Sequence, residues 1–325
     1  MAKQFLHTIA LATEDLPASA TRAPFDLPVN PLSMLFLRFQ ITNVAPAALD
    51  TYSAIDDVIT MVTNVQITHK GESIVNASLR DIVVAMAARH KLFPGWSVLS
   101  NIDNAVRSLV FPICLGRRPY DAMSCFPATS RGNLKMQITV GADGAAFDDI
   151  NVSVEAVELL DATPSEYVKL TTLSRDSVVG QFDLDLPIGN DLLGIVLFDT
   201  GLFGATDEVT SWGQVKLLKD NVEQYFPNSD IETLCAMLNA QLGSMPGWPG
   251  HQHQFNGAAA ALDESDDAGL AVSTGMLGYA YLDFDPLRDN EYTLVTEGAS
   301  RLLLRGVGDE ATAVRALPFE VMRVK

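Results

Sequence analysis

The amino-acid sequence contains the same outline twice, and this repeat limits the fold more than any other feature. Seven short segments of the first half return in the second half in the same chain order, with offsets between 151 and 167 residues. The offsets drift only as far as loops of unequal length require. The matched segments are 26–29 with 185–188, 36–43 with 194–201, 78–81 with 229–232, 94–96 with 246–248, 115–119 with 282–286, 140–141 with 307–308, and 154–155 with 319–320. We infer that the chain consists of two tandem copies of one domain.

Length and charge agree with two folded domains and narrow the range of partners. Two units of roughly 150 residues each have the usual size of a domain, and 48% hydrophobic with 19% charged residues is typical of a folded chain. The net charge is −18 with only 22 Lys and Arg residues. This argues against sequence-specific nucleic-acid binding, which needs a basic face, and against broad adhesion to an anionic membrane. We interpret the acidity as a source of solubility; the alternative is that divalent cations bridge carboxylates at subunit contacts.

The three cysteines do not predict a disulfide framework, because their number is odd and their spacing is wide. Cys235 falls in an amphipathic run and is expected in the core. Cys114 and Cys125 flank a loop, so a bridge between them stays open, and a reducing compartment is the default expectation. The first residues do not resemble a secretory signal, and no apolar run approaches the length of a membrane-spanning helix.

Alternating apolar residues predict strands in both halves. Leu35, Leu37, Phe39 and Ile41 are separated by Phe36, Arg38 and Gln40, a period typical of a half-buried strand. Other strands are expected at 62–68, 108–115, 133–140, 150–159, 182–186, 192–198, 278–284, 292–296, 301–306 and 312–324. We therefore expect an N-terminal arm at 1–22, a first unit at 23–160, a linker at 161–178 that can include a short strand, and a second unit at 179–325 with a loop insertion at 249–269.

One helix is expected in each half. The first, over 78–89, opens on Ser78, whose hydroxyl can accept from the backbone amide three residues on, and an aspartate stands at the reciprocal position. The second, over 229–242, opens on a full capping box of Ser229 and Glu232. Both carry an apolar stripe at i, i+3, i+4 and i+7. The stripes are Leu79, Ile82, Val83 and Met86 in the first helix, and Ile231, Leu234, Cys235 and Leu238 in the second.

Each half thus consists of short strands, one helix and further short strands, with turns rich in Gly and Pro. This pattern is typical of a sandwich or barrel. The strands are not separated by regular helices, as the strands of a parallel sheet would be. The predicted fold class is all-β with a few helices: two tandem eight-stranded antiparallel jelly rolls, which are β-sandwiches, with one capped helix in each.

With this architecture the chain resembles the double jelly-roll major capsid proteins of tailless icosahedral viruses, the group that includes membrane-containing bacteriophages and adenovirus hexon. The resemblance covers residues 24–325. It rests on the two in-line β units, the helices at 78–89 and 229–242, the N-terminal arm, and a closing alternating strand at 317–324. It implies a structural major capsid protein whose homotrimers form pseudo-hexagonal capsomers and tile an icosahedral virion shell.

The resemblance also implies partners and a location. The partners would be neighbouring trimers, penton or minor capsid proteins, and an inner membrane layer reached through the arm at 1–22. The protein would be made in the host cytoplasm and located in the virion capsid. The family has no catalytic, cofactor-binding or metal-binding residues to carry over, so we expect no enzyme activity. Deleting residues 2–20 is expected to leave trimers intact and to impair shell assembly.

Two polar clusters in the insertion have the residue types of a metal site but not its spacing. His251 and His253 lack a third ligand at a diagnostic distance. The acidic segment 263–267 lacks the glycine and the terminal glutamate of a helix-loop-helix Ca²⁺ site. We expect solvated loops at both places; a structural Ca²⁺ ion at the acidic loops is the alternative.

Two pairs of carboxylates lie on strand faces, Asp183 with Asp185 and Asp283 with Asp285. A glycosidase uses a pair of carboxylates, but alternation alone places polar residues outward on a sandwich strand, and we favour that interpretation. The sequence contains no GxSxG, phosphate-loop or dinucleotide-binding motif. These observations do not favour an enzyme.

Two other functions stay open beside the capsid. One is a two-domain jelly-roll glycan-binding protein or glycan-acting hydrolase. Trp96 and Trp248, at equivalent positions of the repeat, would then offer stacking surfaces for sugars, although shared packing after the helix explains them more simply. The other is a bacterial assembly protein of the spore-coat type. A stable trimer that polymerises would favour the shell, and a monomer with affinity for sugars would favour the glycan protein.

Overall fold

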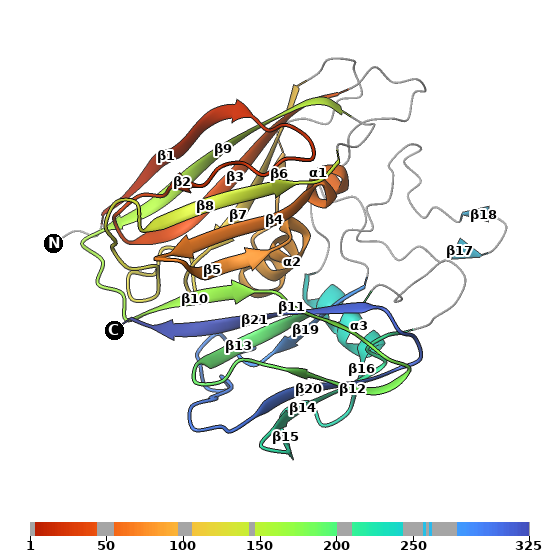
Figure 1. The fold of residues 1–325 in the computed structure, drawn as a ribbon. Helices are drawn as coiled ribbons and strands as arrows, with labels where there is room; N and C mark the ends of the chain where they lie inside the picture. The colour runs from red at the N-terminus through yellow and green to blue at the C-terminus, as the bar shows by residue number, and fades with distance from the viewer. Residues whose placement is uncertain are drawn as a thin grey trace.

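The computed structural model describes residues 4–43, 55–96, 106–142, 147–199, 210–242, 256–257, 260–261 and 278–324. These residues form two β units that lie side by side and share a sheet (Figure 1). The first unit contains β1 Gln4–Asp15, β2 Phe25–Asp26, β3 Leu32–Asn43, α1 Ile55–Met61, β4 Val62–His69, β5 Glu72–Ala77, α2 Leu79–His90, β6 Gly95–Trp96, β7 Val106–Cys114, β8 Leu134–Val140 and β9 Phe147–Leu160. The second contains β10 Glu166–Thr171, β11 Leu173–Asp176, β12 Gly180–Asp185, β13 Asp191–Phe198, β14 Gln214–Lys219, β15 Val222–Glu223, β16 Ser229–Asp230, α3 Ile231–Leu242, β17 Asn256–Gly257, β18 Ala260–Ala261, β19 Tyr279–Asp283, β20 Leu302–Gly308 and β21 Ala313–Arg323.

Both units have the same strand order in both of their sheets. In the first unit, one sheet has the order β1-β9-β3-β7-β6 and the other contains β5-β4-β8-β2. In the second unit, the matching strands are ordered β21-β13-β19 and β15-β14-β20-β12. The sequence repeat is therefore a repeat of topology, with one long helix in each copy. This order of strands confirms the predicted tandem jelly rolls.

Alternation decides which side chains of each strand face the interior. In β3, Leu35, Leu37, Phe39 and Ile41 are fully buried, because successive residues of a strand point to opposite faces of the sheet. The buried apolar side chains form two clusters, one centred on each unit. β13 differs from β3, since six of its eight residues are buried. Its unbroken apolar run is typical of a strand that is covered on both faces.

The two units are joined by a continuous sheet. β10 pairs antiparallel with β21 of its own unit and parallel with β5 of the first unit, with Leu170 opposite Val75. The sheet therefore runs from β19 through β13, β21, β10, β5, β4 and β8 to β2. This corrects the linker expected at 161–178, because most of that segment belongs to β10 and β11. Val168 and Leu170 alternate with polar residues there and are buried.

The structure also corrects the N-terminal arm expected at 1–22. Residues 4–15 form β1, which pairs with β9 from Gln4 opposite Leu160 to Asp15 opposite Asn151. No charged residue occurs between positions 4 and 13, and Leu11 is buried in the core of the first unit. An uncharged segment of this kind completes the sheet instead of remaining in solvent.

Two further expectations differ from the structure or lie outside it. Residues 292–296 were expected to form a strand, but only an isolated bridge joins Leu294 to Leu192. Of the insertion at 249–269, only the short pair β17 and β18 falls within the described residues. The remaining residues of that insertion lie outside the described part of the chain.

The two long helices begin differently. α2 starts after Ser78, whose Oγ accepts from the amide of Asp81 at 3.1 Å, as the sequence predicts. α3 starts only at Ile231, and Ser229 belongs to β16 opposite Val215. The capping box expected from Ser229 is therefore wrong. Within the described part of the chain, no helix combines the length and apolar character needed to cross a membrane.

Candidate functional site

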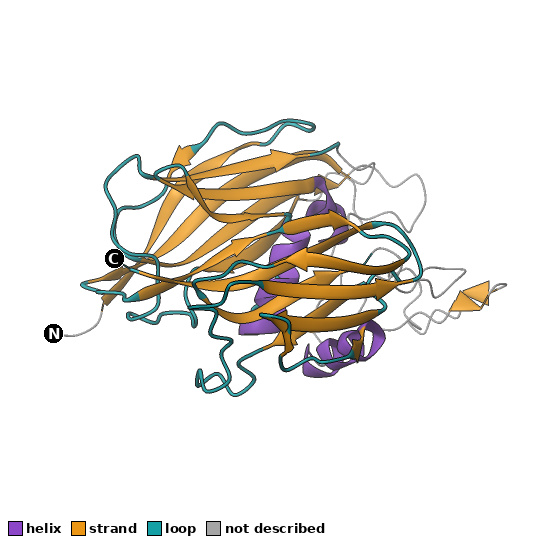
Figure 2. Cartoon of the chain, turned by 60° about the horizontal axis from the view of Figure 1, so that its bottom comes forward, coloured by secondary structure: helices purple, strands orange, loops and turns teal. Residues whose placement is uncertain are grey.

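Helix α2 occupies the junction of the two units. It packs on β7 of its own unit and contacts β13 and α3 of the second. Figure 2 shows a purple helix in the middle of the molecule, with the orange strands of the two units on either side of it. Ten of the twelve residues of α2 are buried, and two of these, Asp81 and Arg89, are charged. A buried charge is costly unless it is paired, so the partners of these two residues determine how the units meet.

Asp81 binds two residues of the second unit. The Tyr279 hydroxyl donates to Oδ1 at 2.6 Å, and the Arg315 guanidinium donates to both carboxylate oxygens at 3.0 and 3.1 Å. Arg315 also lies over the Phe198 ring, 3.9 Å from its centroid. Burial, followed by the charge of Asp81, raises the pKa of Tyr279 well above its usual value. The phenol therefore stays protonated and keeps donating to the carboxylate.

Arg89 makes the second contact, about two turns further along α2. Its guanidinium donates to Oδ2 of Asp285 at 2.5 Å and to the Asp285 carbonyl at 3.3 Å. Asp285 is completely buried and accepts from the Asn290 amide as well. Arg288 adds a bond to Asp283 at 2.9 Å and a longer one to the carbonyl of Ala88. The helix is thus held at both ends by groups of the second unit.

These contacts fix one orientation of the units. Separating or rotating the units would leave Asp81 and Arg89 without partners, and breaking a buried pair costs about 3–5 kcal/mol. The same pairs add little over apolar packing when they are intact. We infer that their effect is to exclude other arrangements. The shared sheet and these pairs therefore hold the two units in the one orientation that the structure shows.

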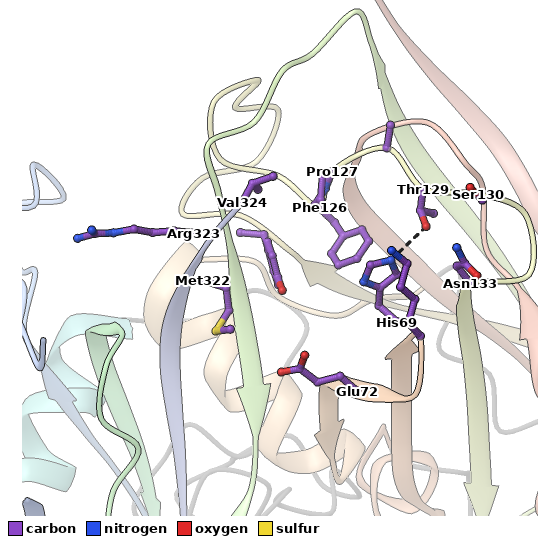
Figure 3. A pocket seen from close by; sticks show the side chains of 13 residues that line it. His69, Glu72, Phe126, Pro127, Thr129, Ser130, Asn133, Met322, Arg323 and Val324 are labelled. Carbon is purple, nitrogen blue, oxygen red and sulfur yellow. Dashed lines mark hydrogen bonds between the residues drawn. The ribbon is translucent and has the colours of Figure 1, made fainter.

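A hollow of about 560 Å³ lies between the units near the C-terminus (Figure 3). Its wall includes His69 and Phe126 of the first unit and Tyr167 and Met322 of the second. His69 Nε2 lies 3.2 Å from the Thr129 hydroxyl, and its ring meets the edge of Phe126 at 5.2 Å between centroids. Burial, helped by Lys70, lowers the pKa of His69. The imidazole is therefore neutral near pH 7, and the wall is built by packing and a neutral hydrogen bond.

Strand β1 begins at the end of the molecule that carries both termini (Figure 1), and exposed apolar side chains surround its first residues. Phe5 and Tyr120 meet there edge to face, 5.3 Å apart, beside Met123 and Leu160, and together they line a hollow of about 500 Å³. Exposed apolar groups at one end of a soluble domain indicate a contact surface. Phe5, Tyr120 and Met123 are each about half exposed.

The carboxylate pairs singled out in the sequence are bound by arginines. Asp183 accepts two bonds from Arg305, at 2.6 and 3.0 Å, and Asp185 accepts one from Arg301. The hydrogen bonds from Arg305 lower the pKa of Asp183. Asp183 therefore does not have the raised pKa of a general acid.

The outward orientation expected for Asp283 and Asp285 is wrong for Asp285, which is 0% exposed. The chain leaves β19 just before Asp285, so the alternation of the strand no longer decides where its side chain points. Asp283 is almost covered as well, and both carboxylates bind Arg89 or Arg288. This pair holds the junction together.

The other candidate residues have structural surroundings or lie outside the described part. Cys114, Cys125 and Cys235 are free and buried, and burial raises the pKa of the Cys114 and Cys125 thiols to about 12. The bridge that stayed open between Cys114 and Cys125 is therefore not formed. His251, His253, the acidic segment 263–267 and Trp248 are outside the described residues. Within the described ranges, no group of three His, Cys, Asp or Glu residues could hold a metal ion.

The topology and the buried junction define the class of the protein, a double jelly roll, and solved structures of this class match nearly the whole chain. Major capsid protein P2 from bacteriophage PM2 matches with a TM-score of 0.62 and 13% identity, over 99% of this chain and 98% of that chain. A chain of Sulfolobus Turreted Icosahedral Virus matches with a TM-score of 0.66 and 13% identity, over 98% and 91%. The PBCV-1 virus capsid matches with a TM-score of 0.60 and 10% identity, over 99% and 95%.

Sequence comparison adds nothing to this likeness. No protein-family model matches the chain, and no curated protein matches it either. At 10–13% identity the similarity lies in the fold. It establishes that the chain has the double jelly-roll fold of these capsid proteins.

Sequence reasoning did not find the residues that hold the junction. Asp81 was visible only as part of a helix cap, and Arg89 only as a basic residue near the end of the helix. The available signal was a charge near each end of a helix whose central residues, 82–88, are all apolar. Such a helix is expected to be covered on all sides, and its charges then need partners elsewhere.

Proposed function

We propose that the chain is the structural major capsid protein of an icosahedral virion, and that it trimerises into pseudo-hexagonal capsomers that tile the shell. The observation that carries the proposal is the duplicated jelly roll itself. It matches chains of three viruses over at least 98% of this chain and at least 91% of each matched chain. A block made of two like units supplies two of the six similar corners that a pseudo-hexagonal trimer needs.

The rigid junction supports this proposal. A tile in a closed shell has to present its contact surfaces at fixed angles. The shared sheet and the pairs Asp81–Arg315 and Arg89–Asp285 hold the two units in one orientation. A flexible two-domain hydrolase would need the opposite property, a junction that opens around its substrate.

The exposed apolar end supports contacts beyond the trimer. Phe5, Tyr120 and Met123 lie beside the N-terminus and are about half exposed. We propose that this end meets the layer beneath the shell, either minor capsid proteins or an inner membrane. Synthesis in the host cytoplasm, penton partners and the absence of enzyme activity belong to the same proposal.

The glycan-binding or glycan-hydrolysing alternative has less support. Its candidate acids Asp183 and Asp185 form ion pairs with Arg305 and Arg301, and Asp285 is buried at the junction. A glycosidase needs one carboxyl group with a raised pKa facing a cleft. Of the described pairs, Asp183 has a pKa lowered by its bonds from Arg305, and Asp285 is buried away from solvent.

The first experiment is the mass of the purified protein in solution, measured by light scattering after size exclusion, with and without Ca²⁺. We expect three times the chain mass of 35.1 kDa, or particles of shell size, and a six-sided outline in electron micrographs. A clean monomer that never associates would contradict the proposal and would shift the interpretation to a sugar-binding jelly roll.

Ionic strength should control how trimers assemble further. Each chain has a net charge of −18, so trimers repel one another. Salt at physiological concentration shortens the range of this repulsion to about 8–10 Å. We expect moderate salt or divalent cations to increase the fraction of shell-sized particles in light scattering, without changing the trimer. Assembly that does not depend on ionic strength would contradict electrostatic control.

A further inference from the structure

The two units of one chain already form an interface between similar surfaces. On the first unit the contact surface is α2 and the edge strand β5. On the second unit it is the outer face of the sheet β21-β13-β19 together with β10. Because the units have the same topology, each also carries the surface that the other unit uses. These two remaining surfaces are α3 of the second unit and the outer face of β9-β3-β7 of the first.

The helix surface is recognised by aligning the two helices. Their apolar stripes coincide when α3 is shifted by 152 positions, so that Ile231 matches Leu79 and Leu238 matches Met86. The outer face of α3 consists of Thr233, Ala236, Met237, Ala240 and Gln241. All five residues are exposed, and Met237 in the centre of the face is 46% exposed. The five residues of α2 at the aligned positions are all buried.

The α3 face contains no charged residue, whereas the matching α2 face is charged at both ends. Thr233 stands where α2 has Asp81, and Gln241 stands where α2 has Arg89. A permanent junction inside one chain can bury ion pairs, because their partners are always present. A face that must exist in water and later be covered costs less to desolvate when it is neutral.

At the matching positions of the sheet surface, neutral groups replace the residues that bind Asp81, while Arg38 on the same face of β3 donates to the Ser108 hydroxyl at 3.2 Å. Strand pairing places Arg315 and Tyr279 on either side of Phe198 in the second unit, and it places Asn151 and Ser108 on either side of Gln40 in the first. The segments containing Phe198 and Gln40 match in the repeat. Asn151, Ser108 and Gln40 are all half-buried.

Asn151 and Ser108 are therefore the counterparts of the two residues that bind Asp81. Opposite Thr233 of another copy, they would form a small polar cluster without a buried ion pair, bordered by Arg38 through its bond to Ser108, in place of the Asp81, Tyr279 and Arg315 cluster. The edge strands agree with this arrangement. β1 pairs with β9 as β10 pairs with β21, and the sheet ends at β1.

We propose that the α3 face docks on the outer face of β9-β3-β7 of a second copy of this chain, in the way that α2 docks on β21-β13-β19 within the chain. The contact is head-to-tail, so repeating it either closes a ring or continues as a filament. The inference rests on the proposed function, in which three chains close the ring. It adds the surfaces that meet and makes Met237 the central apolar side chain.

The test compares Met237→Glu with Leu287→Glu. Leu287 is 62% exposed, lies in the loop between β19 and β20, and belongs to neither surface. Because a charge at the centre of an interface is seldom tolerated, Met237→Glu should weaken trimer formation about tenfold or more in light scattering across a dilution series. Leu287→Glu should behave as the wild type. A wild-type trimer that Met237→Glu leaves unchanged would overturn the inference and leave the proposed function standing, whereas a monomeric wild type would overturn both.

A cross-linking experiment tests the pairing of surfaces without depending on a loss of assembly. One preparation carries Thr233→Cys and the other carries Asn151→Cys, and the two are mixed under mild oxidation. We expect covalent dimers from the mixture and none from either preparation alone. Trimers that mix freely between preparations but give no covalent dimer would overturn the proposed pairing.

Discussion

At the scale of single residues, His90 is the group through which acid should first weaken the fold. Its Nε2 atom is buried without a hydrogen-bond partner. Burial, together with the charges of Arg89 and Arg288, lowers the pKa of His90 to about 3. The unfolded chain takes up this proton near pH 6.5 and the folded chain only near pH 3. The free energy of unfolding therefore falls as the pH drops through this window, by about 2 kcal/mol between pH 7 and pH 5.

The variant His90→Leu tests this effect. Leucine already occupies the matching position of α3, at Leu242, so the side chain suits this place on the helix. Urea unfolding at pH 7 and pH 5 should show a loss of stability in the wild type that is smaller by about 2 kcal/mol in the variant. Carboxylates titrate in both proteins and cancel in the comparison. Equal losses in the two proteins would show that His90 does not remain neutral in the fold.

The buried ion pair of Asp81 leads to a second prediction at this scale. Asp81→Ala would leave Arg315 and the Tyr279 hydroxyl without their shared acceptor, so we expect a loss of about 3 kcal/mol or more in the free energy of unfolding. Asp183→Ala is the matched control, because it removes a bidentate Arg305 pair that lies nearer the surface. There we expect about 1 kcal/mol or less. Similar losses in both variants, measured by urea unfolding, would contradict the distinction between the two pairs.

At the scale of elements, the two long helices should respond differently to the loss of a serine. Ser78 caps α2 through its hydroxyl, so Ser78→Ala should destabilise the protein by about 1 kcal/mol. Ser229 lies in β16, one residue before Asp230 and outside α3, so Ser229→Ala should change the stability by less than about 0.5 kcal/mol. Thermal unfolding of both variants provides the comparison. A larger effect at Ser229 would mean that the capping box read from the sequence is correct.

Elements with a clear period were predictable, and elements defined by distant partners were not. β8 alternates strictly and β3 over most of its length, and both were predicted within a few residues of their ends. β1 was missed because Ile9, Ala10, Leu11 and Ala12 are apolar at successive positions, which hides its period of two. Its identity as a strand depends on pairing with β9, about 150 residues away. The junction was missed for the same reason, since the partners of Asp81 and Arg89 lie 234 and 196 residues further along the chain.

At the scale of the whole molecule, duplication explains why the two units can differ in charge while sharing a fold. The internal junction forms once and stays buried, so it uses Asp81, Arg89 and their partners. The surfaces left for other copies are neutral on α3 and apolar at the end that carries the termini. The net negative charge on the rest of the chain then keeps separate copies apart until their contact surfaces meet. The division between a charged junction inside the chain and an uncharged α3 face outside it is the feature that suits the molecule to assembly.

The N-terminal segment gives the last prediction at this scale. Deletion of residues 2–20 was expected to spare the trimer, but this segment contains β1 and buries Leu11 and Leu16 in the first unit. Its loss would expose the long edge of β9 and remove part of the core, so we now expect the truncated chain to aggregate or to unfold at a clearly lower temperature.

Two point variants separate packing from surface contacts in the same strand. Leu11→Ala should cost about 2–5 kcal/mol because its side chain is buried. Ile9→Ala should leave the stability of the isolated chain nearly unchanged, since Ile9 is 72% exposed on the same strand. If the truncated chain instead forms normal trimers at the wild-type unfolding temperature, β1 is dispensable for the fold and the original expectation of an independent arm is right. If truncation and Leu11→Ala both destabilise the trimer while Ile9→Ala does not, β1 is an integral strand of the first jelly roll.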